Sequence, residues 1–130
     1  MIASGNGKAI YLVIADKIID EIMSGTLKAE DRLLSIRDYA SLVQVNHNTV
    51  KRTYDYLSDQ GLIYNQRGIG FYVAPDARKE AERLRTREVL GNEIVKLFRQ
   101  LQLLGVTPGQ LADRYSEFLM SNESEKHQNQ

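Results

Sequence analysis

Polar side chains in the middle of the chain have the types and the spacing needed to contact a nucleic acid. The positions i, i+3, i+4 and i+7 of one helix face are those of Asn48, Lys51, Arg52 and Asp55. An amide can pair bidentately with an adenine edge, and Lys or Arg can reach guanine acceptors or phosphates. His47 stands beside them on the first turn. The pattern favours base-edge readout, although a solvated helix face would produce the same residues.

A second basic position lies in the segment Arg67-Gly68-Ile69-Gly70, which joins two short apolar stretches. Glycines supply backbone angles that a hairpin needs and let the backbone approach a ligand closely. Arg67 between them suits a phosphate or a narrow minor groove. Gly68 and Gly70 can serve the hairpin turn alone, and both interpretations can hold together.

The helix that carries Asn48 and Lys51 needs a defined start. Asn46 is a good N-cap, and a buried line of Val50, Tyr54 and Leu57 leads to Gly61 as the closing glycine. A neutral cap also leaves the first N–H groups of the helix available to a phosphate without repelling it.

The elements around this helix are short. Apolar residues recur at helical spacing from Ile10 to Ser24-Gly25, and a second helix begins after Ser35. Its Arg37 could clamp a phosphate or pair with Asp38 or Glu30. Strands are predicted at residues 62–64 and 71–73. Helix, helix, tight turn, helix and two-stranded wing is the order of a winged helix-turn-helix, mostly α with a small β-hairpin, and we assign it to residues 8–74.

Residues 75–120 predict a pair of helices. Residues 76–104 form a long amphipathic segment that ends at Gly105, and Thr107-Pro108 begins the second helix. An apolar stripe runs along both, and self-association would bury it. The expected dimerisation residues are Leu90, Ile94, Leu97, Phe98, Leu101, Leu104, Leu111, Tyr115 and Phe118. The alternative is that the stripe packs back on its own domain. The polar tail 121–130 is predicted to be disordered.

Several function classes are disfavoured. The 130 residues carry no cysteine and no net charge, with basic and acidic residues balanced also within residues 1–74. His47 and His127 are far apart, so neither a metal site nor an acid–base pair is expected. Gly68-x-Gly70 lacks the third glycine of a dinucleotide fingerprint. No stretch approaches the ~20 apolar residues of a membrane span. We therefore expect no enzymatic activity, no cofactor, no metal and no membrane partner.

The spaced series from Asn46-x-Asn48-Thr49-Val50 through Tyr54, Leu57, Gly61-Leu62-Ile63 and Gly68-x-Gly70 to Val73 resembles the DNA-binding domain of the GntR family of bacterial transcription regulators, especially its YtrA-like branch. The resemblance covers roughly residues 8 to 74. It departs from the family at Leu34, where a proline is usual, and at His47, where an arginine or proline is common.

The resemblance implies which positions contact operator DNA. They are Arg37, the first turn from Asn46 through His47 and Asn48 to Thr49, the positions of Lys51 and Arg52, and the wing region with Arg67, Gly68 and Gly70. It also implies a short C-terminal helix pair in place of a large effector domain.

These observations predict a cytoplasmic, homodimeric regulator of transcription, a repressor that binds a palindromic double-stranded operator through the recognition helix and wing. Because the chain has no excess positive charge, the basic residues must be segregated on one face. Two alternatives stay open: a winged-helix module that binds proteins, and a ligand-responsive switch. The sequence identifies neither the operator nor an effector.

Overall fold

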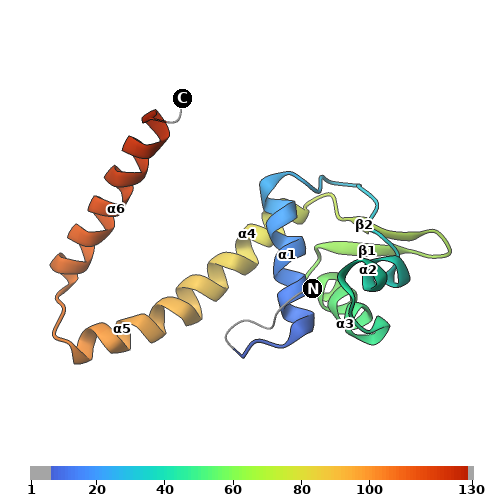
Figure 1. Cartoon of the computed structure of the whole chain (residues 1–130), viewed down its shortest axis with the longest axis horizontal. Coiled ribbons are helices and arrows are strands. Elements are labelled where there is room, and N and C mark those ends of the chain that lie inside the picture. The colour runs from blue at the N-terminus through green and yellow to red at the C-terminus, as the bar shows by residue number, and fades with distance from the viewer. Residues whose placement is uncertain (1–6, 129–130) are drawn as a thin grey trace. The chain divides into compact units, whose positions relative to one another are not determined.

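The computed structural model describes residues 7–128, with side chains as far as residue 123. The chain divides into an N-terminal unit, residues 1–86, and a C-terminal unit, residues 87–130, and each is described by itself (Figure 1). No helix within residues 7–128 is long and apolar enough to cross a membrane.

Two helices of the N-terminal unit begin where their capping residues predict. Helix α1 spans Ile10–Ser24, α2 spans Ile36–Val43 and α3 spans His47–Asp59. The Ser35 hydroxyl accepts a hydrogen bond from the Asp38 N–H at 3.0 Å, and the Asn46 side chain accepts one from the Asn48 N–H at 2.8 Å. Both predicted N-caps are therefore confirmed, and the short break between α2 and α3 creates the helix-turn-helix.

The wing is an antiparallel hairpin of β1, Ile63–Gln66, and β2, Gly70–Val73, with the register running from Ile63 opposite Val73 to Gln66 opposite Gly70. Residues 30–33 pair with its second strand. The N–H groups of Glu30 and Leu33 donate to the carbonyls of Val73 and Phe71, each at 2.9 Å. This third pairing was not predicted, because residues 26–34 show no alternation of apolar and polar side chains.

Buried aliphatic and aromatic side chains from α1, α2, α3 and the sheet form the core, which includes Ile14, Ile18, Ile22, Val43, Val50, Tyr54, Leu57, Leu62 and Val73. Two hydroxyls fix α3 within it. Tyr54 donates to the Leu34 carbonyl at 2.7 Å, and the fully buried Thr53 donates to the Tyr11 carbonyl at 2.8 Å. Because these bonds are made to the main chain of other elements, they set the orientation of α3.

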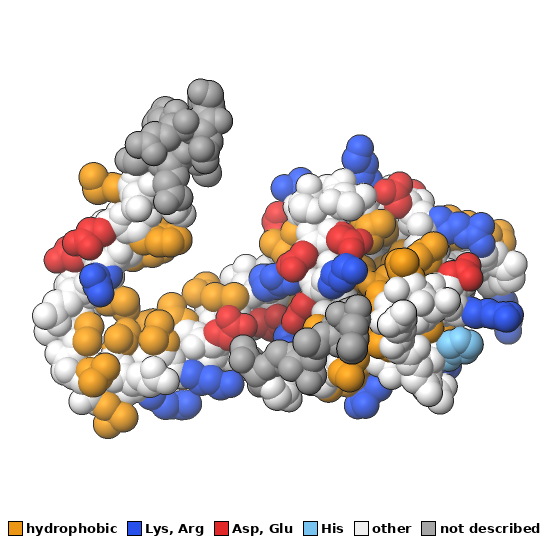
Figure 2. Space-filling model, in the orientation of Figure 1, with side chains coloured by type: hydrophobic (Ala, Val, Ile, Leu, Met, Phe, Trp, Pro, Cys, Tyr) orange, Lys and Arg blue, Asp and Glu red, His pale blue; other side chains and the backbone are white. Residues whose placement is uncertain are grey.

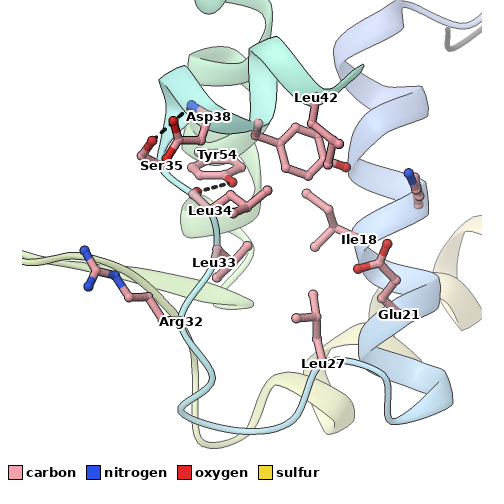
Figure 3. Close-up of a pocket in the computed structure, with 12 residues that line it drawn as sticks. Ile18, Glu21, Leu27, Arg32, Leu33, Leu34, Ser35, Asp38, Leu42 and Tyr54 are labelled. Atoms are coloured by element: carbon pink, nitrogen blue, oxygen red, sulfur yellow. Dashed lines mark hydrogen bonds between the residues drawn. The ribbon is translucent and has the colours of Figure 1, made fainter. Parts of the chain in front are cut away.

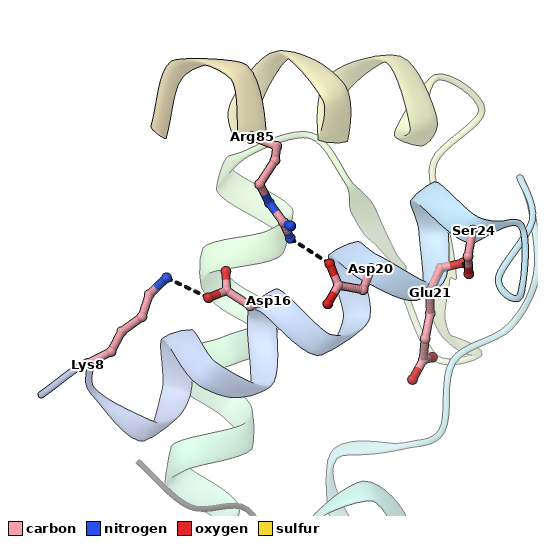
Figure 4. A network of polar contacts seen from close by, with 6 residues as sticks. All are labelled: Lys8, Asp16, Asp20, Glu21, Ser24 and Arg85. Carbon is pink, nitrogen blue, oxygen red and sulfur yellow. Dashed lines mark hydrogen bonds and ion pairs between the residues drawn. The ribbon is translucent and has the colours of Figure 1, made fainter. Parts of the chain in front are cut away.

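Helix α4, Ala77–Glu88, belongs to the N-terminal core for most of its length. Ala77, Ala81 and Leu84 are buried at i, i+4 and i+7, and Arg85 forms an ion pair with Asp20 of α1 at 2.9 Å (Figure 4). The compact N-terminal unit thus extends to Thr86, whereas the sequence predicts the DNA-binding domain over residues 8–74. A helix with small apolar residues at these positions gives a weak amphipathic signal.

The C-terminal unit contains a π-helical turn, Val89–Glu93, helix α5, Ile94–Leu103, and helix α6, Pro108–Gln128. The predicted cap of α6 is present: the Gln110 N–H donates to the Thr107 hydroxyl at 3.2 Å, and the Thr107 N–H donates to the Gln110 side chain at 2.9 Å. Helix α6 continues through most of the tail predicted to be disordered, because no Gly or Pro follows Gly109 to stop it. Residues 129–130 of that tail lie outside the described residues.

Candidate nucleic-acid interface

The first turn of α3 is exposed and polar. The side chains of Asn46, His47 and Asn48 are all exposed, whereas Thr49 is half-buried. Within this turn the Asn48 N–H donates to the Asn46 side chain at 2.8 Å and the Thr49 N–H donates to the Asn46 carbonyl at 3.0 Å. The expected contact residues therefore lie together at the start of α3, with Thr49 at the edge of the group.

Lys51 lies one turn further along the exposed side of α3. Its ammonium forms an ion pair with Asp55 at 2.9 Å, and both side chains are more than half exposed, at 63% and 59%. Exposed pairs of this kind hold little free energy, so the ammonium can exchange its carboxylate for another anion. The outer face of α3 is consequently less positive than Lys51 alone would make it.

Arg52 is exposed but turned toward α1. Its guanidinium carbon lies 4.0 Å from the ring centroid of Tyr11, a cation–π contact. The expected contiguous group of Asn48, Lys51 and Arg52 is therefore divided: Lys51 pairs along its own helix, and Arg52 stacks on a neighbouring one.

The wing carries an exposed cation at its tip. Arg67 and Gly68 are the central residues of a turn that the Ile69 N–H closes by donating to the Gln66 carbonyl at 2.9 Å. Gly68 has φ +77°, which residues with a side chain rarely adopt. The turn thus requires glycine at this position and leaves Arg67 at the outer end of the hairpin.

Arg37 is exposed in the first turn of α2. Neither of the acids considered as its partner, Asp38 or Glu30, forms an ion pair with it in the described part of the chain. Asp38 instead lies beside the Ser35 cap, and Glu30 accepts a hydrogen bond from Tyr64. Arg37 is therefore available to an external anion.

Acidic groups of α1 are engaged by basic residues of the same unit. Asp16 pairs with Lys8 and Asp20 with Arg85 (Figure 4). Figure 2 shows Lys and Arg side chains among the acidic ones over α1 and also near the hairpin. These ion pairs thus neutralise acidic groups of α1 locally, in a chain whose net charge is zero.

A groove of about 430 Å³ opens between α1, α2 and the segment that joins them (Figure 3). Its lining includes Glu21, Tyr39 and Tyr54. Burial, and then the nearby charge of Glu21, raises the pKa of the Tyr39 phenol, and burial raises the pKa of the Tyr54 phenol. Both phenols stay neutral at physiological pH, and Tyr54 serves as a donor to Leu34 that supports the start of α2.

The C-terminal unit has a larger, mainly apolar groove of about 890 Å³ between α5 and α6. Figure 2 shows apolar side chains gathered along α5. The structure brings together these predicted dimerisation residues in its lining: Leu90, Ile94, Leu97, Phe98, Leu101, Leu111 and Tyr115. Leu104 and Phe118 are exposed outside it.

Sequence reasoning missed three residues that organise the interface. Tyr11 supports Arg52, Thr53 ties α3 to α1, and Arg32 contacts the wing. Only Thr53 left a usable signal, since it stands beside Tyr54 on the buried side of α3. No group of three or more His, Asp or Glu residues within the described residues is arranged to hold a metal ion.

Known proteins share both the sequence pattern and the fold. Residues 10–73 match the model of the bacterial regulatory proteins of the gntR family. The uncharacterised HTH-type transcriptional regulator YhcF of Bacillus subtilis is 33% identical over 115 residues, which span 87% of this chain and 92% of YhcF. The HTH-type transcriptional repressor YtrA of B. subtilis is 33% identical over 69 residues, 53% of each chain.

A solved structure agrees over nearly the whole length. The crystal structure of a transcriptional regulator of the GntR family from Bacteroides thetaiotaomicron superposes with a TM-score of 0.78 at 46% identity, and it covers 87% of this chain and 99% of that one. The winged helix-turn-helix fold, the sequence similarity to YtrA and these matches all indicate the same family. The chain belongs to the GntR family of DNA-binding transcription regulators, which are not enzymes.

Proposed function

We propose that this protein is a homodimeric repressor in the cytoplasm, which binds a palindromic operator with α3 in the major groove and the wing against the adjacent backbone. The observation that supports this most directly is the exposed polar first turn of α3 in the same unit as a hairpin with Arg67 at its tip.

Each exposed group has a separate task in this proposal. The positive end of the α3 dipole favours a phosphate, and Asn46 caps the helix without adding negative charge. Asn48 and Lys51 face base edges in the major groove. Arg37 and Arg67 contact phosphates, which adds affinity for any sequence. Specificity therefore comes from α3, and orientation comes from α2 and the wing.

The dimer contact in this proposal is the groove between α5 and α6. Leu97 and Phe98 keep 46% and 44% of their surface exposed although both line an apolar groove. A second copy would remove this surface from water, which favours association by about 25 cal/mol per Å² of apolar area. Because a two-fold axis repeats each recognition helix once, the operator would be an inverted repeat.

Repression is proposed because the relative YtrA is a transcriptional repressor. A dimer on its operator would exclude polymerase from an overlapping promoter. No group in the described residues identifies an effector, so the proposal includes none.

The test is selection of bound fragments from random duplex DNA, followed by measurement of affinity for the selected sequence across a range of salt concentrations. Recovery of an inverted repeat, with affinity that falls steeply with salt, supports the proposal. Replacement of Leu97 by Glu should then give a monomer in sedimentation and much weaker operator binding. Selection of single half-sites, or a wild-type monomer at micromolar concentration, would overturn the dimer.

A further inference from the structure

We propose that Arg32 is the positioning residue of the wing: it holds the tip of the hairpin so that Arg67 is presented to DNA. This inference rests on the proposed function for the role of Arg67, whereas the contact itself is a property of the free protein.

The contact runs along the hairpin from the segment beside β2 to the tip. The Nη2 group of Arg32 donates a hydrogen bond of 2.7 Å to the carbonyl of Ile69, the residue that closes the turn at the tip. Arg32 belongs to the segment that pairs with β2, where it lies opposite Tyr72. Figure 3 shows the side chain directed along the hairpin, away from the other residues of the α1–α2 groove.

Gly70 provides the space for this guanidinium. A Cβ atom at Gly70 would lie 3.2 Å from Nε and 3.3 Å from Nη2 of Arg32, and the φ of +148° is one that side chains rarely permit. Gly70, which the sequence predicts as a hairpin glycine, therefore also leaves room for the guanidinium of Arg32. This explains why Gly70 is half-buried in an exposed hairpin.

The tip needs such a contact because little else fixes it. Residues 65–69 are exposed, and the main-chain bonds from residues 30–33 reach β2 only at Phe71 and Val73. An isolated two-stranded hairpin is marginally stable in water. Near the base, Tyr64 stacks on Tyr72 and bonds to Glu30. Glu30 and Arg32 thus connect one segment to the base and to the tip of the wing.

An arginine suits this position for a physical reason. Its guanidinium remains charged and carries several N–H donors in a planar fork, so one donor can hold the Ile69 carbonyl while others stay in solvent. The competing explanation is that Arg32 itself contacts a phosphate. The two explanations differ in whether the effects of Arg32 and Arg67 are coupled.

The experiment is a double-mutant cycle on the full chain with Arg32→Met, Arg67→Ala and the double variant, read as operator affinity and as its dependence on salt. If Arg32 acts through Arg67, each single variant should reduce the salt slope by about 1 and the double variant should reduce it no further. The affinity of the double variant should then match that of the weaker single variant within about twofold. Arg32→Lys, which keeps the charge and one donor, should recover part of the affinity.

A second measurement requires no DNA. Amide hydrogen exchange at Ile69 in the free protein should accelerate in Arg32→Met and stay unchanged in Lys79→Met, which removes an exposed cation from α4. An unchanged exchange rate at Ile69 would overturn the inference. So would a double variant whose loss of affinity equals the product of the two single losses and whose salt slope falls by about 2. If the wild type selects no DNA sequence, the proposed function fails and the exchange result alone decides the role of Arg32.

Discussion

The guanidinium carbon of Arg52 in α3 lies over the ring of Tyr11 in α1, 4.0 Å from the centre of the ring. The same ring makes a T-shaped contact with Tyr56, with centroids 6.3 Å apart. Together these contacts hold Arg52 on the α1 side of the recognition helix. Arg52 is also exposed, so the stack can present its guanidinium to DNA as well as join the two helices.

This stack predicts a measurable coupling between Tyr11 and Arg52. In urea unfolding of the wild type, Tyr11→Leu, Arg52→Gln and the double variant, the two changes should interact by about 0.5–1 kcal/mol, the usual range for an exposed cation–π contact. Arg87→Gln, an exposed change in the other unit, should add independently to Tyr11→Leu. Simple additivity of Tyr11 and Arg52 would show that the contact contributes nothing to stability.

The ion pair between Lys51 and Asp55 predicts opposite effects of its two members on DNA binding. Lys51→Ala should weaken binding to the selected operator by about 1–3 kcal/mol if the ammonium reads a base. Asp55→Ala should strengthen binding, because it removes a carboxylate that both holds Lys51 and repels phosphate. Fluorescence anisotropy at fixed salt measures both, with Lys79→Ala as the control for loss of one exposed charge. Weaker binding by Asp55→Ala would assign a direct base contact to Asp55.

Local signals predicted the helices of the wing domain well, because their ends are determined by neighbouring residues. Ser35 and Asn46 cap α2 and α3 through bonds that span two or three residues. The hairpin glycines likewise follow from the turn. The same reasoning identified the exposed polar turn of α3, since exposure follows from the buried line opposite it.

Contacts between distant segments could not be predicted in this way. Arg32 meets the wing across 37 positions and Thr53 meets Tyr11 across 42, and no periodicity encodes such pairings. The cation–π contact of Arg52 with Tyr11 of α1 is another long-range contact of this kind, whereas Lys51 pairs with Asp55, four residues on in its own helix.

Buried Tyr54 predicts a loss of stability in alkaline solution. Burial raises its pKa above the ordinary value of 10.0, so above that pH the unfolded phenol loses its proton while the folded one keeps it. The stabilisation is therefore complete below pH 10 and declines as pH rises toward the folded pKa. Urea midpoints at pH 8 and pH 11 should differ less in Tyr54→Phe than in the wild type.

Tyr54→Phe should also lower the free energy of unfolding by about 0.5–1.5 kcal/mol at neutral pH, because the Leu34 carbonyl loses its hydrogen-bond donor. An alkaline decline of equal size in Tyr54→Phe and the wild type would assign the effect to other groups.

The position of α4 predicts where the chain can be cut. A fragment that ends at Thr86 should fold as a monomer with weak operator affinity, because it keeps Ala77, Ala81 and Leu84 in the core but lacks the apolar groove of α5 and α6. A fragment that ends at Ala74 exposes that core. The packing of Leu84 gives the expected size of the effect, since Leu84→Ala in the full chain should lower the free energy of unfolding by about 2–5 kcal/mol.

Circular dichroism during urea unfolding ranks the stability of the two fragments, and sedimentation gives their mass. Equal stability of the two fragments would mean that α4 adds nothing to the wing domain, and a dimeric fragment ending at Thr86 would move the dimer contact out of α5 and α6.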